Sequence, residues 1–152
     1  MKIKLRLNWL KSGSPVHRAF KESFAHDYCM NYVKKVNGYL PMELDGQLSK
    51  SELDKKIGNV WFCDRSSQAK VLSSEDVARC LQKVWDQGVS ELQIVIGGAD
   101  GFSLVDEKVW KPELRWSFGK MTLPHELAAV VASEQIYRAL TIIKKHPYHN
   151  GH

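Results

Sequence analysis

The 152-residue sequence predicts an α/β domain with a mainly parallel sheet and helices on both faces. Strand-like and helix-like patterns alternate along the chain, as they do in proteins whose parallel strands are joined by helices. Two apolar runs, Val60–Cys63 and Leu92–Ile96, are continuous, which is typical of strands buried on both faces of such a sheet. No linker or low-complexity segment interrupts the pattern, so we expect residues 1–152 to form a single domain.

The first third of the chain predicts a strand, a helix and a second strand. Apolar and polar residues alternate over the first nine positions, which indicates a half-buried strand. Ser14 and Pro15 are typical of a helix start, and apolar residues then recur about every fourth position as far as Val36. The Asn-Gly pair that follows ends this helix, and residues 39–44 are predicted to be a short strand.

In the middle of the chain, a serine at position 49 or 51 can cap a short helix that runs to Lys56. The buried run Val60–Cys63 is followed by a polar loop. The sequence Ser73-Ser74-Glu75-Asp76 opens the next helix, because a serine cap precedes acidic residues in the first turn. Gly88 ends that helix, and Leu92–Ile96 forms the next strand.

The last third predicts a helix over residues 102–109, a strand over 115–118 and a long helix over 125–143. Open parallel sheets bind ligands at the carboxyl ends of their strands. Three loops follow such ends: residues 64–70, 97–101 and 119–124. A ligand site is therefore predicted where these loops meet.

Composition narrows the class of protein. A net charge of +5 favours polyanionic partners such as RNA. The three cysteines lie far apart without a CxxC pair, so no metal site is expected. No apolar run is long enough to cross a membrane, and the charged N-terminus is a poor signal peptide, so a cytoplasmic location is expected.

Several motifs have two interpretations. Gly97–Gly101 is either a loop that offers backbone groups to a cofactor or a tight turn, and it matches neither dinucleotide nor triphosphate motifs. His125 is either a base or a residue that satisfies hydrogen bonds at a helix start. Glu134 and Arg138 form an i,i+4 pair that suggests bracing, within the chain or across a subunit interface.

The tail His146-Pro147-Tyr148-His149 concentrates polar rings behind a proline that must leave the helix. A stiff tail can direct Tyr148 and His149 into a pocket, as hydrogen-bond donors or as a base near neutral pH. A disordered end with incidental histidines, His152 included, is the other interpretation.

Four segments together resemble the RlmH family of SPOUT-class rRNA methyltransferases: IGGADG, S-x-x-x-MTLPH, EQIYRAxxI and HPYH. The resemblance covers nearly the whole chain. It implies methylation of N3 of a pseudouridine in large-subunit (23S) ribosomal RNA with S-adenosylmethionine. It also implies a C-terminal trefoil knot, a homodimer and the ribosome as partner.

Positions carried over from the family give the expected site. The resemblance implies a cofactor pocket formed by Cys63, Gly98, Gly119, Lys120, Met121, Thr122, Leu123 and Pro124. It also places the tail near the methyl donor. There we expect His149 to accept the proton of the target nitrogen and Tyr148 to position the base.

Three features depart from the family pattern. The loop Asp64–Lys70 is longer and lacks the usual glycine, and Ala129 and Asn150 stand where relatives commonly carry basic residues. These departures keep an alternative open: a catalytically inactive knotted dimer that acts as an RNA-binding or ribosome-assembly protein. Methylation of another RNA by the same pocket is a third possibility.

Overall fold

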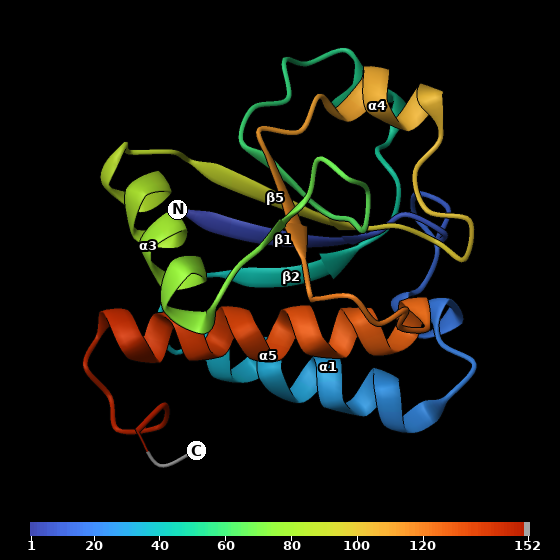
Figure 1. Ribbon diagram of the computed structural model, residues 1–152. Coiled ribbons are helices and arrows are strands. Elements are labelled where there is room, and N and C mark those ends of the chain that lie inside the picture. The colour runs from blue at the N-terminus through green and yellow to red at the C-terminus, as the bar shows by residue number, and fades with distance from the viewer. Residues whose placement is uncertain (151–152) are drawn as a thin grey trace.

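The computed structural model describes residues 1–150, and its centre is a six-stranded sheet (Figure 1). The strands lie in the order β2–β1–β5–β3–β6–β4, and every neighbouring pair is parallel. Their bounds are β1 (Lys2–Leu7), β2 (Met42–Asp45), β3 (Val60–Cys63), β4 (Lys70–Val71), β5 (Glu91–Ile96) and β6 (Leu114–Ser117). The predicted mainly parallel sheet is confirmed. The two-residue edge strand β4 was expected to be loop, because so short a segment carries no periodicity.

The described part of the chain has five α-helices, of which the first four connect strands and the fifth follows the last strand: α1 (Ser23–Val36), α2 (Lys50–Leu53), α3 (Ser74–Asp86), α4 (Leu104–Trp110) and α5 (His125–Ile143). Serine side chains cap three of them. In each case an acidic side chain at the third helical position accepts a hydrogen bond from the backbone N–H of the capping serine. The predicted cap at Ser73 is confirmed, and of the two candidates at positions 49 and 51 the cap is Ser49.

The prediction that one helix runs from Pro15 to Val36 is wrong at its start. The segment Val16–Ala19 is a separate 3-10 turn, and Phe20 is extended, with φ −117° and ψ 123°. The indole N–H of Trp9 donates to the Ala19 carbonyl at 2.7 Å. This hydrogen bond ties the turn to the segment after β1, a tertiary contact that helical periodicity cannot reveal.

Helices cover both faces of the sheet, as predicted. Helices α1, α3 and α5 pack on one face, where Ile3, Leu5 and Leu7 of β1 join the main apolar core. On the other face, Trp110 of α4 packs in a smaller core with Phe62 of β3. Figure 1 shows α1 and α5 beneath the sheet and α4 above it.

The second face of β1 carries a buried charge. Arg6 is fully buried, and its guanidinium donates to the Gln93 side chain at 2.9 Å and to Glu52 at 2.5 Å. It also lies 3.1 Å from an Asp45 carboxylate oxygen. The half-buried strand predicted from alternation is therefore more buried than expected, because ion pairs allow an arginine to occupy the polar face.

Candidate functional site

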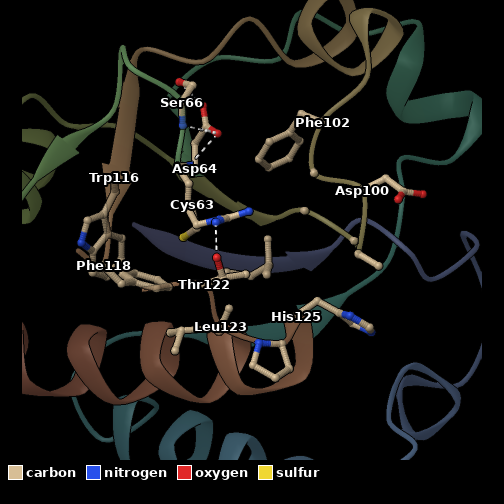
Figure 2. A pocket seen from close by; sticks show the side chains of 18 of the residues that line it. Cys63, Asp64, Ser66, Asp100, Phe102, Trp116, Phe118, Thr122, Leu123 and His125 are labelled. Atoms are coloured by element: carbon tan, nitrogen blue, oxygen red, sulfur yellow. Dashed lines mark hydrogen bonds between the residues drawn. The ribbon is translucent and has the colours of Figure 1, made fainter. Parts of the chain in front are cut away.

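A cavity of about 830 Å³ opens at the carboxyl ends of β3, β5 and β6 (Figure 2). Parts of all three predicted loops line it: Asp64 to Ser66, Gly97 to Gly101, and Met121 to Pro124. The prediction that these loops meet at one edge of the sheet is confirmed. The start of α5 closes the cavity from below, through His125 and Ala128.

The glycine loop after β5 is a tight turn that also forms a wall of the cavity. The Gly101 N–H donates to the Gly98 carbonyl at 3.0 Å, and Gly101 has φ +74°. A Cβ atom at Gly97 would lie 3.2 Å from the backbone of Gly101. The tight-turn interpretation is confirmed, and the same turn lines the cavity with its backbone.

Aromatic side chains form much of the apolar lining. Trp116 and Phe118 meet edge to face, with ring centroids 4.9 Å apart. Across the cavity, Phe102 stacks on Phe62 at 3.8 Å, and Figure 2 shows Phe102 opposite the Trp116–Phe118 pair. These lining residues were missed from the sequence. The alternation Trp116-Ser117-Phe118 at a strand end was the available signal, because it puts both rings on one side of β6.

Asp64 organises the first loop. Its carboxylate accepts from the Arg65 N–H at 2.7 Å, from the Ser66 hydroxyl at 2.8 Å and from Arg115 at 2.9 Å. Partial burial favours a higher pKa for Asp64, but these hydrogen bonds outweigh burial and lower the pKa below its usual value. Asp64 is therefore an ionised, fully engaged anchor of the loop.

The side chain of Cys63 faces the cavity from the end of β3. Burial, and secondarily the charge of Asp64, raise the pKa of its thiol well above the usual value. The thiol stays protonated at neutral pH, so Cys63 acts as a small apolar lining residue and not as a nucleophile.

His125 lies at the first position of α5, and its ring meets the edge of the Trp9 ring at a centroid distance of 4.4 Å. The same histidine lines the cavity. It thus packs the helix start against the segment after β1 while one edge stays near the ligand space.

Six of the eight expected cofactor residues line the cavity: Cys63, Gly98, Met121, Thr122, Leu123 and Pro124. Gly119 and Lys120 lie in the same loop but outside the cavity wall. Gly119 has φ +112°, and its N–H donates to the Ser117 hydroxyl at 3.1 Å, so it shapes the loop. Lys120 is exposed.

Ala129 is fully buried in the main core. Within this chain the position faces neither the cavity nor solvent. The departure from the family pattern at this position therefore lies in the core of the single chain.

The structure places Tyr148 and His149 beside the second half of α5, outside the cavity lining. The Tyr148 hydroxyl donates to Glu134 at 3.1 Å, and the Arg138 guanidinium lies 4.9 Å from the centre of the Tyr148 ring. The two nitrogens of His149 lie 3.1 Å from Arg138 and 2.7 Å from Glu75. The described part of the tail is therefore docked on α3 and α5.

The docked tail and the cavity lie against different parts of α5. The first turn of the helix lines the cavity through His125 and Ala128, whereas the tail contacts Glu134 and Arg138, at and beyond the middle of the helix. One chain by itself does not bring Tyr148 and His149 to the cavity.

The site offers ligand-binding chemistry of a particular kind. Aromatic and aliphatic walls suit a flat ring, loop backbone supplies hydrogen-bonding groups, and Arg65 contributes a positive charge. Within residues 1–150, no group of three or more His, Cys, Asp or Glu side chains is arranged to hold a metal ion. The same residues contain no helix long and apolar enough to cross a membrane.

Comparison with known proteins supplies the context for this cavity. A family model described as "Predicted SPOUT methyltransferase" matches residues 16–149. A Koribacter versatilis (strain Ellin345) protein is 35% identical over 155 residues, covering 99% of this chain and 100% of its own length. A relative from Lactococcus lactis subsp. cremoris (strain SK11) is 35% identical over 149 residues, covering 85% and 92%. Both relatives carry the name "Ribosomal RNA large subunit methyltransferase H".

Among solved structures, Lpg2936 from Legionella pneumophila, determined with bound SAM, aligns with a TM-score of 0.44 at 12% identity. The alignment covers 91% of this chain and 66% of that one. Similarity at this level is too low to support a conclusion about this chain.

Proposed function

This chain belongs to the SPOUT methyltransferase family, and from that membership we propose a specific reaction. The protein uses S-adenosylmethionine to methylate N3 of a pseudouridine in large-subunit (23S) ribosomal RNA. Two observations support the proposal. Relatives that match over nearly their whole length are named as large-subunit rRNA methyltransferases. Two of the four motifs that resemble the RlmH family, IGGADG and MTLPH, line one cavity at the strand ends.

The observation that carries the proposal is the meeting of two distant loops. The turn at Gly98 and the loop at Met121 wall the same cavity, although they follow different strands. Trp116, Phe118 and Leu123 offer an apolar bed for an adenine ring, and the cavity volume is in the range of small-molecule sites. The residues present therefore fit the cofactor. When bound, S-adenosylmethionine supplies a methyl group activated by a positively charged sulfur.

The protein's own chemical task is to align the target nitrogen and to accept its proton. We assign proton acceptance to His149 and positioning of the base to Tyr148. Burial and the Glu134 carboxylate raise the pKa of the Tyr148 phenol, so it remains a hydrogen-bond donor. Arg138 can only donate, so in the docked tail Nδ1 of His149 accepts and Nε2 donates to Glu75. For His149 to accept a proton at Nδ1, the Arg138 guanidinium must therefore move away from this nitrogen.

The separation of tail and cavity supports a homodimer. Large apolar side chains are exposed on α1 and α5, where Phe24 and Tyr28 are each 55% exposed and Leu127 is 39% exposed, and we propose that they form one strip. A two-fold axis across this strip would set the two α5 helices antiparallel. The tail of each chain would then lie near the cavity of its partner.

A C-terminal trefoil knot is part of the proposal. The chain passes from β5 to β6 across β3, and β6 inserts between β3 and β4. The loops that enclose the cavity come from this crossing segment and from the end of β3. We further propose that residues 1–152 form a single domain that meets the ribosome in the cytoplasm through its basic surface.

Two measurements test the proposed function. Isothermal titration should show S-adenosylmethionine binding to the purified protein. Mass spectrometry of rRNA from cells lacking the protein should show the loss of one methyl group from a large-subunit pseudouridine. Methylation of this unmethylated rRNA by the purified protein would show that the protein itself catalyses the reaction. RNA binding without cofactor binding would instead support an inactive knotted dimer that acts as an RNA-binding or ribosome-assembly protein.

A further inference from the structure

Arg65 reaches across the cavity. Its Nη1 donates to the Thr122 hydroxyl, 2.5 Å away, and this contact joins the loop after β3 to the loop after β6. The dashed line to Thr122 in Figure 2 marks this bond, which crosses the space between the two loops. The Arg65 backbone is held as well, because its N–H donates to Asp64. The guanidinium is therefore directed over the ligand space from an anchored position.

The charge of Arg65 lacks a carboxylate partner among residues 1–150. By contrast, Arg6, Arg79, Arg115 and Arg138 each form an ion pair with an aspartate or glutamate. The neighbouring anion, Asp64, is already satisfied by Arg115 and by its own loop. Thr122 uses one of the five guanidinium donors, so a planar fork remains for an anion in the cavity.

We propose that Arg65, oriented by Thr122, binds the α-carboxylate of the methionine part of S-adenosylmethionine. This assignment rests on the proposed function. The cofactor's other two charges, the sulfonium and the ammonium, are positive, so the carboxylate is the only anionic group with which a guanidinium can form an ion pair. Adenine and ribose are uncharged and suit the aromatic wall. The arginine thereby sets which end of the cofactor lies beside the loop after β3.

The test compares two ligands that differ only in the carboxylate: S-adenosylhomocysteine and its decarboxylated form. Their dissociation constants are measured by calorimetry with the wild-type chain, Arg65→Gln and Lys108→Gln. Lys108 is exposed on α4 and does not line the cavity, so its variant controls for net charge. Arg65→Gln should weaken S-adenosylhomocysteine binding about tenfold, as expected for a charge-assisted hydrogen bond. The decarboxylated ligand should change less than about twofold, and Lys108→Gln should alter neither.

Other results would overturn the assignment. If Arg65→Gln weakens the binding of both ligands equally, Arg65 shapes the cavity and does not bind the carboxylate. Unchanged cofactor affinity together with weaker, less salt-dependent RNA binding would assign Arg65 to an RNA phosphate. A wild-type chain that binds neither ligand would refute the proposed function itself, a result distinct from either of these. Thermal unfolding of each variant verifies that the fold is intact.

Discussion

Lack of space requires glycine at position 97, whereas position 98 is less restricted. A Cβ at Gly97 would meet backbone atoms of Gly101 at 3.2 to 3.3 Å, and backbone in a tight turn cannot easily move aside. A Cβ at Gly98 would meet only the Trp9 Cβ at 3.4 Å, an ordinary van der Waals distance. Two adjacent glycines in one motif therefore serve different purposes.

This difference leads to a paired prediction. Gly97→Ala should destabilise the protein by about 1–2 kcal/mol, because the loop must shift to relieve the clash. It should also weaken cofactor binding. Gly98→Ala should keep the wild-type free energy of unfolding within about 0.5 kcal/mol. Urea unfolding of both variants measures the difference, and equal stabilities would show that the turn has room to adjust.

The role assigned to His149 is tested at the same scale. His149→Ala should lower the single-turnover rate of methyl transfer about 100-fold or more, because a positioned base contributes that much. His17→Ala, which changes an exposed histidine on the 3-10 turn, is the matched control. A His149→Ala rate close to that of the control would disprove the assignment.

At the scale of elements, an ion-pair network attaches α2 to the sheet. Partial burial favours a higher pKa for Glu52, but hydrogen bonds from Arg6 and the Ser49 N–H, with the charges of Arg6 and Lys4, outweigh it and lower the pKa from 4.5 to about 2. The folded state therefore holds Glu52 ionised over a pH range in which the unfolded chain takes up a proton. The stabilisation is complete above pH 4.5 and is lost as the pH falls toward about 2.

Acid unfolding should reveal this link. Glu52→Gln should be less stable than wild type at neutral pH, because Arg6 is buried and loses a charged partner. Below pH 4.5 the stability of the variant should fall less steeply than that of wild type. Glu43→Gln, which removes a more exposed carboxylate on β2, is the matched control. If the free energy of unfolding falls equally steeply with pH in Glu52→Gln and in wild type, Glu52 does not have the proposed role.

Helix α5 sets the geometry of the whole site. Its first residues line the cavity, its middle packs in the core through fully buried Ala132 and Ile136, and the docked tail contacts it at Glu134 and Arg138. The two proposed halves of the active site therefore contact different parts of one helix. Neither Tyr148 nor His149 lines the cavity of its own chain, which is why we propose that a second molecule brings the halves together.

At the scale of the whole molecule, we predict that the strip containing Phe24, Tyr28 and Leu127 is a dimer interface. Phe24→Glu should give a monomer in light scattering, since a charge at an apolar interface is costly. The chain should stay folded, because Phe24 is 55% exposed in the single chain. A monomeric wild-type protein, or an unchanged dimer in the variant, would rule out this interface.

Mixed dimers test whether the tail acts on the partner's cavity. Ala99→Trp should fill the cavity from its exposed glycine loop, and His149→Ala removes the proposed base. If each site combines one cavity with the partner's tail, mixing the two inactive variants should restore about a quarter of wild-type activity. No recovery, despite mixed dimers in native mass spectrometry, would place tail and cavity in the same chain.

The sequence by itself determined the parallel α/β class, the serine caps and the loops that meet at the cavity. These features follow from local periodicity and from the rule that parallel strands present their carboxyl ends at one edge. Only the tertiary structure decided that Trp116 and Phe118 face the cavity, that Arg65 bonds to Thr122 and that Ala129 is buried. It alone showed the tail docked far from the cavity, because such contacts join residues distant along the chain, whose approach depends on how whole elements pack.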